Sequence, residues 1–240
     1  ISQQGPSILS NAYGSFVLVV VDYAAKTIHM ARDALGNRSI FYASQRDQFV
    51  FASEENALLR LGVSSEIDAS RVNSFMAVGQ PAEGSTFFNK IRELPAGCWL
   101  SWRNGKTEIH RYYHPARTAS TFRLNPDEAA GRMRQLLAQA VQRQLSLTDE
   151  TAAVSMSGGL DSSALAVLAR ENRPVVAISY QFPTIAECDE TQWIDDICEH
   201  AKMESVKINA DQFQPLCDDD LDDINPNSPE RSIYHQLRKG

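Results

Sequence analysis

Residues 157–163 read Ser157-Gly158-Gly159-Leu160-Asp161-Ser162-Ser163, and the fold of the second half of the chain is inferred from them. They follow a strand-type run at 151–156 and precede an apolar, helix-type run at 164–169. A glycine turn between a strand and a helix brings the backbone close to a bound anion, because glycine has no Cβ. The free N–H groups and the positive dipole end of the helix then point at that anion. The stretch therefore predicts a phosphate-binding loop.

The polar side chains of this loop indicate which phosphate chemistry it serves. The hydroxyls of Ser157, Ser162 and Ser163 add hydrogen-bond donors. The loop has neither the Lys of a Walker A loop nor the third Gly of a dinucleotide fingerprint. Asp161 would repel phosphates unless a cation lay between them, so the sequence predicts Mg²⁺ beside Asp161. The alternative is a Gly-Ser turn in which Ser and Asp only cap the helix.

The rest of this half alternates strands and helices. Strands are predicted at 151–156, 174–180 and 205–209, and a helix at 190–202. This alternation predicts right-handed crossovers and a doubly wound parallel sheet with both faces covered by helices. Ligands of such sheets bind at the carboxyl ends of the strands, where the loop lies.

A long helix is predicted to precede this sheet. Asn125 is a suitable N-cap, Pro126 suits the first helical position, and acidic residues follow. Apolar residues at helical spacing predict one buried face, made of Met133, Leu136, Leu137, Ala140, Val141 and Leu145.

The first half of the chain is rich in strand-type runs. Strands are predicted at 16–21, 27–31, 39–42, 48–51, 98–102 and 107–110, and helices at 53–59 and 68–76. Asn104-Gly105 marks a hairpin, and the strands are expected to pair antiparallel in chain order. The whole chain is therefore predicted to be α/β, with an antiparallel, β-rich α+β first half.

The motif Ser-Gly-Gly-Leu-Asp-Ser-Ser resembles the PP-loop of the ATP pyrophosphatase superfamily, and with its flanks it is similar to the synthetase domain of the asparagine synthetase B family. The resemblance implies ATP and Mg²⁺ as cofactors, with the phosphates on residues 157–163 and Mg²⁺ at Asp161. It also places adenine against the backbone of Met156 and Tyr180. The alternative for these two residues is a core position at a strand end without a ligand.

The first half resembles the C-terminal portion of the class II glutamine amidotransferase domain of the same family. The resemblance rests on four motifs in family order, at 14–22, 31–42, 51–54 and 91–97. Ser39 departs from it, because the family usually has Pro there. The implied domains are a partial amidotransferase-like domain at 1–118 and a partial PP-loop synthetase domain at 119–240, with the linker in 117–125.

The resemblance implies an ATP-dependent amide-forming ligase of the glutamine-hydrolysing asparagine synthase type. A carboxylate would attack the α-phosphate of ATP to give an acyl-adenylate and pyrophosphate, and nitrogen from glutamine or ammonia would follow. One alternative is an intramolecular amide-forming relative, such as a β-lactam synthetase or a lasso-peptide macrolactam synthetase. Another is a non-catalytic nucleotide-binding protein with a vestigial ligase fold, against which the intact loop argues.

Composition limits the partners. The formal net charge of −7 leaves no basic footprint for nucleic acid, and no apolar run reaches the roughly 18 residues of a membrane helix. Four cysteines without metal or disulfide spacing predict a reduced, cytoplasmic setting. A small-molecule or peptide carboxylate is the expected substrate, and a homodimer is compatible with the sequence.

The sequence gives weaker support for a catalytic or metal-binding role at other residues. A class II amidotransferase uses an N-terminal Cys nucleophile, whereas this chain begins with Ile1 and its first cysteine is Cys98, so the chain reads as a fragment without that nucleophile. Asp189-Glu190 matches an acidic pair of the family, or it complements a helix dipole. The acidic run 218–223 fails as a calcium loop, and Pro115 disfavours zinc at His110 and His114.

Overall fold

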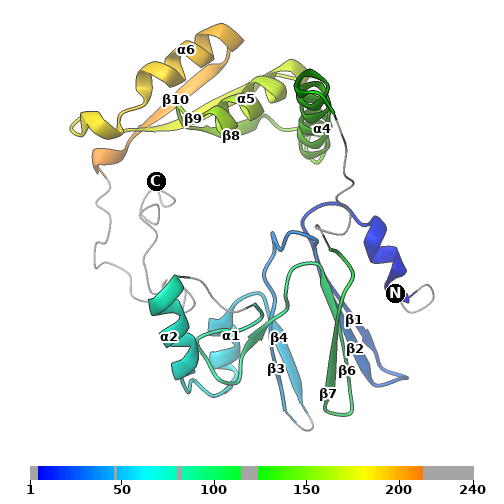
Figure 1. The fold of residues 1–240 in the computed structure, drawn as a ribbon. Coiled ribbons are helices and arrows are strands. Elements are labelled where there is room, and N and C mark those ends of the chain that lie inside the picture. Colours follow the sequence, from blue (N-terminus) through cyan, green and yellow to red (C-terminus); the bar gives the residue numbers. More distant parts are fainter. Residues whose placement is uncertain (1–4, 46–47, 80–82, 115–123, 213–240) are drawn as a thin grey trace. The chain divides into compact units, whose positions relative to one another are not determined.

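The structure is a computed structural model that describes residues 5–45, 48–79, 83–114 and 124–212 (Figure 1). The chain divides into two compact units, whose described residues are 5–114 and 124–212. The domain boundary predicted between 118 and 119, and most of the predicted linker, lie outside the described residues. Both therefore stay predictions, and each unit is described by itself.

The first unit contains two antiparallel sheets. The larger has the strand order β1-β2-β6-β7, with β1 at Val17–Asp22, β2 at Thr27–Arg32, β6 at Cys98–Arg103 and β7 at Lys106–Arg111. The smaller has the order β4-β3-β5, with β4 at Phe49–Ala52, β3 at Phe41–Ser44 and β5 at Arg92–Glu93. The six predicted strands are confirmed, with bounds shifted by a residue or two. The predicted pairing in chain order is wrong at β2, which pairs with β6 rather than β3.

The core of this unit lies between and beside the sheets. Met30, Leu94 and Leu100 are fully buried in the cluster that joins the larger sheet to β3. A second cluster lies on the other side of β3 and β4, where helix α1 (Glu55–Arg60) contributes Leu58 (Figure 1). Helix α2 (Ala69–Val78) begins after Asp68, whose carboxylate accepts the N–H groups of the first turn, and a 3-10 helix, η1, spans Gly5–Asn11.

The turn between β6 and β7 confirms the Asn-Gly hairpin. Asn104 has φ +49° and Gly105 has φ +77°, and Arg103 pairs with Lys106 across the turn. Positive φ at both central residues is the type I′ geometry that matches the twist of paired strands.

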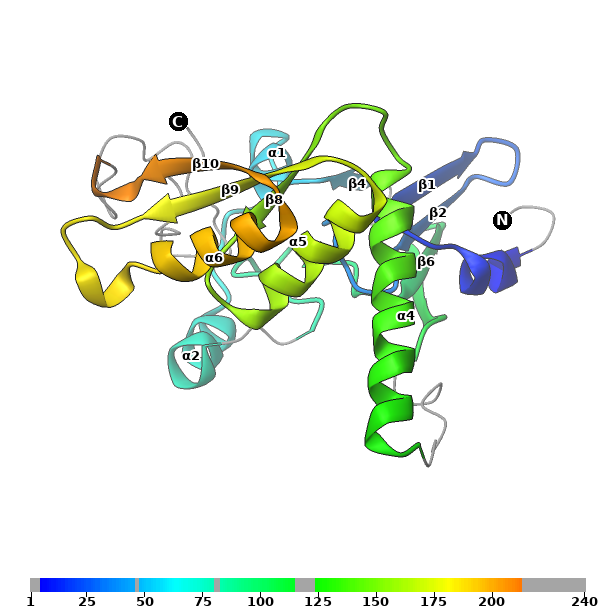
Figure 2. The same cartoon turned by 90° about the horizontal axis from the view of Figure 1, so that it is seen from above.

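The second unit is a parallel sheet with helices packed on it. The strands β8 (Ala152–Met156), β9 (Val175–Gln181) and β10 (Glu204–Asn209) are parallel neighbours in chain order. Helices α5 (Leu160–Asn172) and α6 (Thr191–Ala201) contact each other on one face of this sheet (Figure 2). The described residues of this unit also contain two short 3-10 helices, η2 (Ala186–Cys188) and η3 (Ala210–Gln212). The reversal of strand order that defines a doubly wound sheet is not made by the described residues and stays a prediction.

Helix α4 (Pro126–Leu145) confirms its predicted start. Asn125 Oδ1 accepts the N–H of Glu128 at 2.9 Å, and the Glu128 carboxylate accepts the N–H of Asn125 at 3.2 Å, which is a complete capping box. The predicted buried face is only partly correct. Val141 and Leu145 pack against the core of the unit, whereas Met133 and Leu136 are 64% and 49% exposed. Figure 2 shows the reason, since α4 extends past the sheet and α5.

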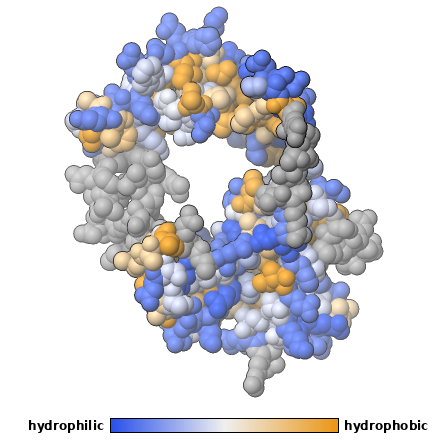
Figure 3. Space-filling model, viewed as in Figure 1, coloured by the Kyte–Doolittle hydropathy of each residue, from blue (hydrophilic) through white to orange (hydrophobic). Residues whose placement is uncertain are grey.

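The visible surface is mostly hydrophilic, with hydrophobic residues interspersed over both units (Figure 3). Within the described ranges, no helix combines the length and the apolar character needed to cross a bilayer.

Candidate functional site

The loop predicted to bind phosphate connects β8 to α5, and its own hydroxyls close it. The N–H of Ser157 donates to Ser162 Oγ at 3.2 Å, and the N–H of Gly159 donates to Ser157 Oγ at 3.3 Å. Ser162 Oγ donates to the Ser157 carbonyl at 3.0 Å, and Ser163 Oγ donates to the Gly159 carbonyl at 2.6 Å. All three predicted hydroxyls therefore lie at the loop. Because hydroxyls rotate, the same groups can donate to an anion instead.

The first turn of α5 has no side-chain cap. Its N-cap is Gly159, which has no side chain to accept the N–H groups that follow, and the described residues supply no side-chain cap bond there. Leu160 is 88% exposed and Asp161 is exposed, so this turn faces solvent. An uncapped, exposed helix start keeps its N–H groups and its dipole available to an anion.

Gly158 lies at a close approach between the loop and α6. A Cβ on Gly158 would lie 3.1 Å from the Cβ atoms of both Glu190 and Trp193. The N–H of Gly158 donates to Glu190 Oε2 at 3.0 Å. The sequence explains Gly158 by the approach of an anion. The structure shows that a side chain at this position would also crowd the start of α6.

The two strand-end residues predicted on the adenine side lie on neighbouring strands beside this loop. Met156 pairs with Ser179, the residue before Tyr180. The Met156 side chain is 4% exposed and packs in the core with α5 and α6, while Tyr180 is half-buried. Only the backbone of Met156 is therefore placed to meet a ligand, and the adenine contact stays a prediction.

Sequence reasoning missed three polar residues at the same edge of the sheet. Gln181 Nε2 donates to Thr191 Oγ1 at 3.0 Å, which ties the end of β9 to the start of α6. The hydroxyl of Ser179 is buried and has no hydrogen-bond partner among the described residues. A serine directly after the apolar residues 175–178 was the available signal for Ser179, whereas the contact between Gln181 and Thr191 had none.

The residues present fit a nucleotide-bound Mg²⁺ better than a protein-held metal. Asp161 offers one exposed carboxylate, and Mg²⁺ commonly takes one or two carboxylates with substrate phosphates and water. In the described part of the chain, no group of three or more His, Cys, Asp or Glu could hold a metal. His110 instead stacks on Trp99 with ring centroids 4.7 Å apart. The acidic run 218–223 lies outside the described residues.

The first unit contains a second polar centre, at the start of the motif 31–42. The Asp33 carboxylate is 1% exposed and accepts the N–H groups of Leu35, Asn37 and Arg38. The adjacent Arg32 guanidinium donates to three carbonyl oxygens and pairs with Glu93 at 2.8 Å. These contacts hold the connection between β2 and β3, so this motif is structural here.

A cavity of about 520 Å³ lies beside this connection. It is lined by Val17, Val19, Asn37, Arg38, Ser39, Ile40, Phe51, Ala52, Ser53 and Glu54. Ser39, where the related family usually has Pro, therefore lies on a cavity wall.

Cys98 is placed to pack rather than to react. It is 3% exposed in β6, and burial raises the pKa of its thiol despite the nearby Arg111 guanidinium. Cys188 is exposed, and Cys198 is buried.

We expect iodoacetamide to alkylate Cys188 at pH 7.5 at least about tenfold faster than Cys98 and Cys198, because only accessible thiolate reacts. Peptide mass mapping at timed quenches measures each cysteine separately. Under denaturing conditions the three rates should converge. Rapid native alkylation of Cys98 would contradict its assignment as a packing residue.

Two family models match the sequence. One, described as a glutamine amidotransferase domain, matches residues 1–113, and the other, described as asparagine synthase, matches residues 132–223. The second match contains the whole loop at 157–163.

Curated relatives resemble the chain over part of their own length. A putative glutamine-hydrolyzing asparagine synthetase of Mycobacterium tuberculosis (strain H37Rv) is 28% identical over 177 residues, which are 71% of this chain and 27% of the relative. Glutamine-hydrolyzing asparagine synthetase 3 of Bacillus subtilis (strain 168) is 29% identical over 158 residues, which are 65% of this chain and 25% of the relative. Amidase chry2 of Gibberella zeae is 30% identical over 166 residues, which are 68% of this chain and 24% of the relative. The chain thus spans about a quarter of the length of these relatives.

Among solved structures, the allosteric regulatory enzyme of purine biosynthesis covers 75% of this chain and 44% of its own, at 13% identity and a TM-score of 0.21. A TM-score this low supports no conclusion about the fold.

Proposed function

The chain belongs to the asparagine synthetase-like family, and from this premise we propose that it supplies the nucleotide-binding loop of an ATP-dependent amide-forming ligase. One observation carries the proposal. The loop 157–163 joins β8 to an uncapped helix start inside the region matched by the asparagine synthase model. Such a start is suited to an anion, and the first unit, matched by a glutamine amidotransferase model, is consistent with glutamine or ammonia as the nitrogen source.

In this proposal the loop holds the β- and γ-phosphates of ATP. The hydroxyls of Ser157, Ser162 and Ser163 turn from their internal acceptors toward phosphate oxygens, and the N–H groups of the first turn of α5 add further donors. Asp161 would hold Mg²⁺, which supplies positive charge against the phosphates. Adenine would lie along the backbone at Met156 and Tyr180.

The reaction proposed is activation of a carboxylate. The carboxylate oxygen attacks the α-phosphorus of ATP, the bond to the bridging oxygen breaks, and pyrophosphate leaves with the electron pair. A loop that already binds pyrophosphate stabilises the charge that develops on this leaving group, because its donors are in place before the reaction. Attack of nitrogen on the acyl-adenylate then gives an amide and AMP.

Exchange of labelled pyrophosphate into ATP tests this chemistry. The protein that contains this chain should catalyse exchange only when a carboxylate substrate is present, with aspartate as the first candidate. The panel of carboxylates should include larger acids that carry an amino group able to attack their own carboxylate. Exchange with these acids and not with aspartate would favour intramolecular amide formation over asparagine formation. Carboxylate-dependent release of ADP and phosphate, without exchange, would contradict the proposal.

A further inference from the structure

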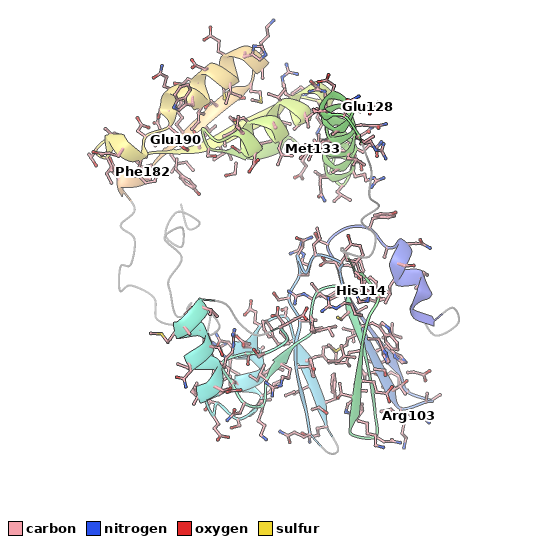
Figure 4. The ribbon with its side chains drawn as sticks, viewed as in Figure 1. Arg103, His114, Glu128, Met133, Phe182 and Glu190 are labelled. Carbon is pink, nitrogen blue, oxygen red and sulfur yellow. The ribbon has the colours of Figure 1, made fainter. Side chains whose placement is uncertain are left out.

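Glu190 occupies an unusual position at the start of α6. It is the N-cap residue of this helix, yet its side chain makes no cap bond to α6. The carboxylate is instead turned to the loop, where Oε2 accepts the N–H of Gly158 at 3.0 Å. Figure 4 labels Glu190 where α6 begins. The Asp189 carboxylate accepts the first N–H of α6, that of Thr191, at 3.3 Å, so the Glu190 side chain is left to bind the loop.

The three N–H groups at residues 157–159 differ in what accepts them. Those of Ser157 and Gly159 donate to serine hydroxyls, whereas that of Gly158 donates to a carboxylate. A hydroxyl can rotate and donate its own proton to a phosphate, but an ionised carboxylate only accepts. A phosphate that binds here can reorient the two serine hydroxyls. Among the acceptors in the described residues, the Glu190 carboxylate is the one that the phosphate has to displace.

The start of α6 has other anchors, so the Glu190 carboxylate can leave without moving the helix. Thr191 Oγ1 accepts from Gln181 at 3.0 Å and donates to Asp189 Oδ1 at 2.5 Å. The first bond joins α6 to the end of β9 and the second lies within the start of α6, and neither involves Gly158.

We propose that Glu190 is a resident anion of the phosphate loop, one that occupies the Gly158 N–H in the nucleotide-free protein and competes with nucleotide phosphate for it. This rests on the proposed function, in which the loop binds ATP. The carboxylate keeps the loop closed and lowers the affinity for nucleotide, most strongly for ATP without Mg²⁺, where no cation separates the like charges.

Glu190→Gln tests the proposal, because it keeps the size of the side chain and removes its charge. A neutral acceptor is held about half as strongly as a charged one, so we expect ATP to bind about tenfold more tightly by calorimetry, with a larger gain in the absence of Mg²⁺. The matched control is Glu187→Gln, the same change at an exposed residue of η2 three positions earlier. It should leave the affinity within about twofold.

A second measurement examines the contact without nucleotide. The amide proton of Gly158 in the NMR spectrum of the nucleotide-free protein should move upfield in Glu190→Gln and stay unchanged in Glu187→Gln, because the charge-assisted bond is lost only in the first. A merely structural role for Glu190 would weaken ATP binding rather than strengthen it.

The outcomes separate the two proposals. Equal or weaker ATP binding by Glu190→Gln, with normal binding by the unchanged protein, would overturn the resident anion and leave the proposed function intact. An equal gain in Glu187→Gln would also overturn it, since general charge would then explain the effect. If none of the three proteins bound ATP while the Gly158 amide still shifted, the proposed function would fall, and the competition with it.

Discussion

Asp161→Ala should abolish Mg²⁺-dependent binding of ATP, a loss of at least about a hundredfold in affinity, while the second unit stays folded. The carboxylate is the charged side chain of the loop and lies in the first turn of α5, where phosphate would also bind. In the proposed function, this change removes the carboxylate that would hold the magnesium ion of the nucleotide at the loop. Calorimetry with and without Mg²⁺ measures the effect, and circular dichroism checks the fold.

The fold should tolerate this change because Asp161 is exposed. Its favourable position on the helix dipole contributes only about 0.3–1 kcal/mol. Asp196→Ala is a matched control, because Asp196 is an exposed carboxylate of α6 away from the loop. Its ATP affinity should match that of the unchanged protein. Full binding by a folded Asp161→Ala protein would remove the assignment of Mg²⁺ to this residue.

Asp33→Ala should lower the free energy of unfolding of the first unit by about 3 kcal/mol or more. Three backbone N–H groups lose their common acceptor in part-buried hydrogen bonds, and donors left unpaired cost about 1–3 kcal/mol each, partly relieved by relaxation and by water. Urea unfolding followed by tryptophan fluorescence measures the change. A Trp193→Phe background confines the signal to Trp99 and Trp102, which both lie in β6.

Acid should reveal the same carboxylate. Burial raises the pKa of Asp33, but the N–H groups of Asn37, Arg38 and Leu35 outweigh burial and hold this pKa below its ordinary value of 3.8. A depressed pKa gives stability that is present above the unfolded value and is lost as pH falls through the folded value. The unchanged protein should therefore lose stability below about pH 4, and Asp33→Ala should lose less over that range.

Asp22→Ala is the control for both measurements. Asp22 accepts one exposed N–H, that of Ala25 at 2.8 Å, so its loss should cost about 1 kcal/mol or less. Equal effects at Asp22 and Asp33 would contradict the structural role given to the Asp33 carboxylate.

Local chemistry made much of this fold predictable. The capping box at Asn125, the positive φ values at Asn104 and Gly105, and the strand–loop–helix at 152–172 each depend on residues a few positions apart. Their sequence signals therefore held without knowledge of the rest of the molecule.

Distant contacts were not predictable in the same way. The pairing of β2 with β6 depends on strands far apart in the chain, and hydrophobic alternation alone does not say which strand is the neighbour. The exposed end of α4 has the same cause, since helical spacing shows an apolar face but not how far a partner extends along it. At the candidate site, the glycines and hydroxyls were visible in the sequence, whereas the reach of Glu190 to Gly158 depends on the packing of α6.

The same long-range pairing bears on how the chain acquires its structure during synthesis. Thr27 pairs with Arg103, so the central pair of strands in the larger sheet cannot form until β6 has left the ribosome. Until then the β1–β2 hairpin lacks its neighbour β6, and a two-stranded ribbon by itself is at best marginally stable in water. In the second unit, β8 pairs with β9 and β9 with β10, and in each pair the second strand emerges one helix later, so these strands can pair in the order of synthesis. The larger sheet of the first unit therefore forms only after β6 has been synthesised. Before that, the apolar run Val17-Leu18-Val19-Val20-Val21 is accessible to chaperones.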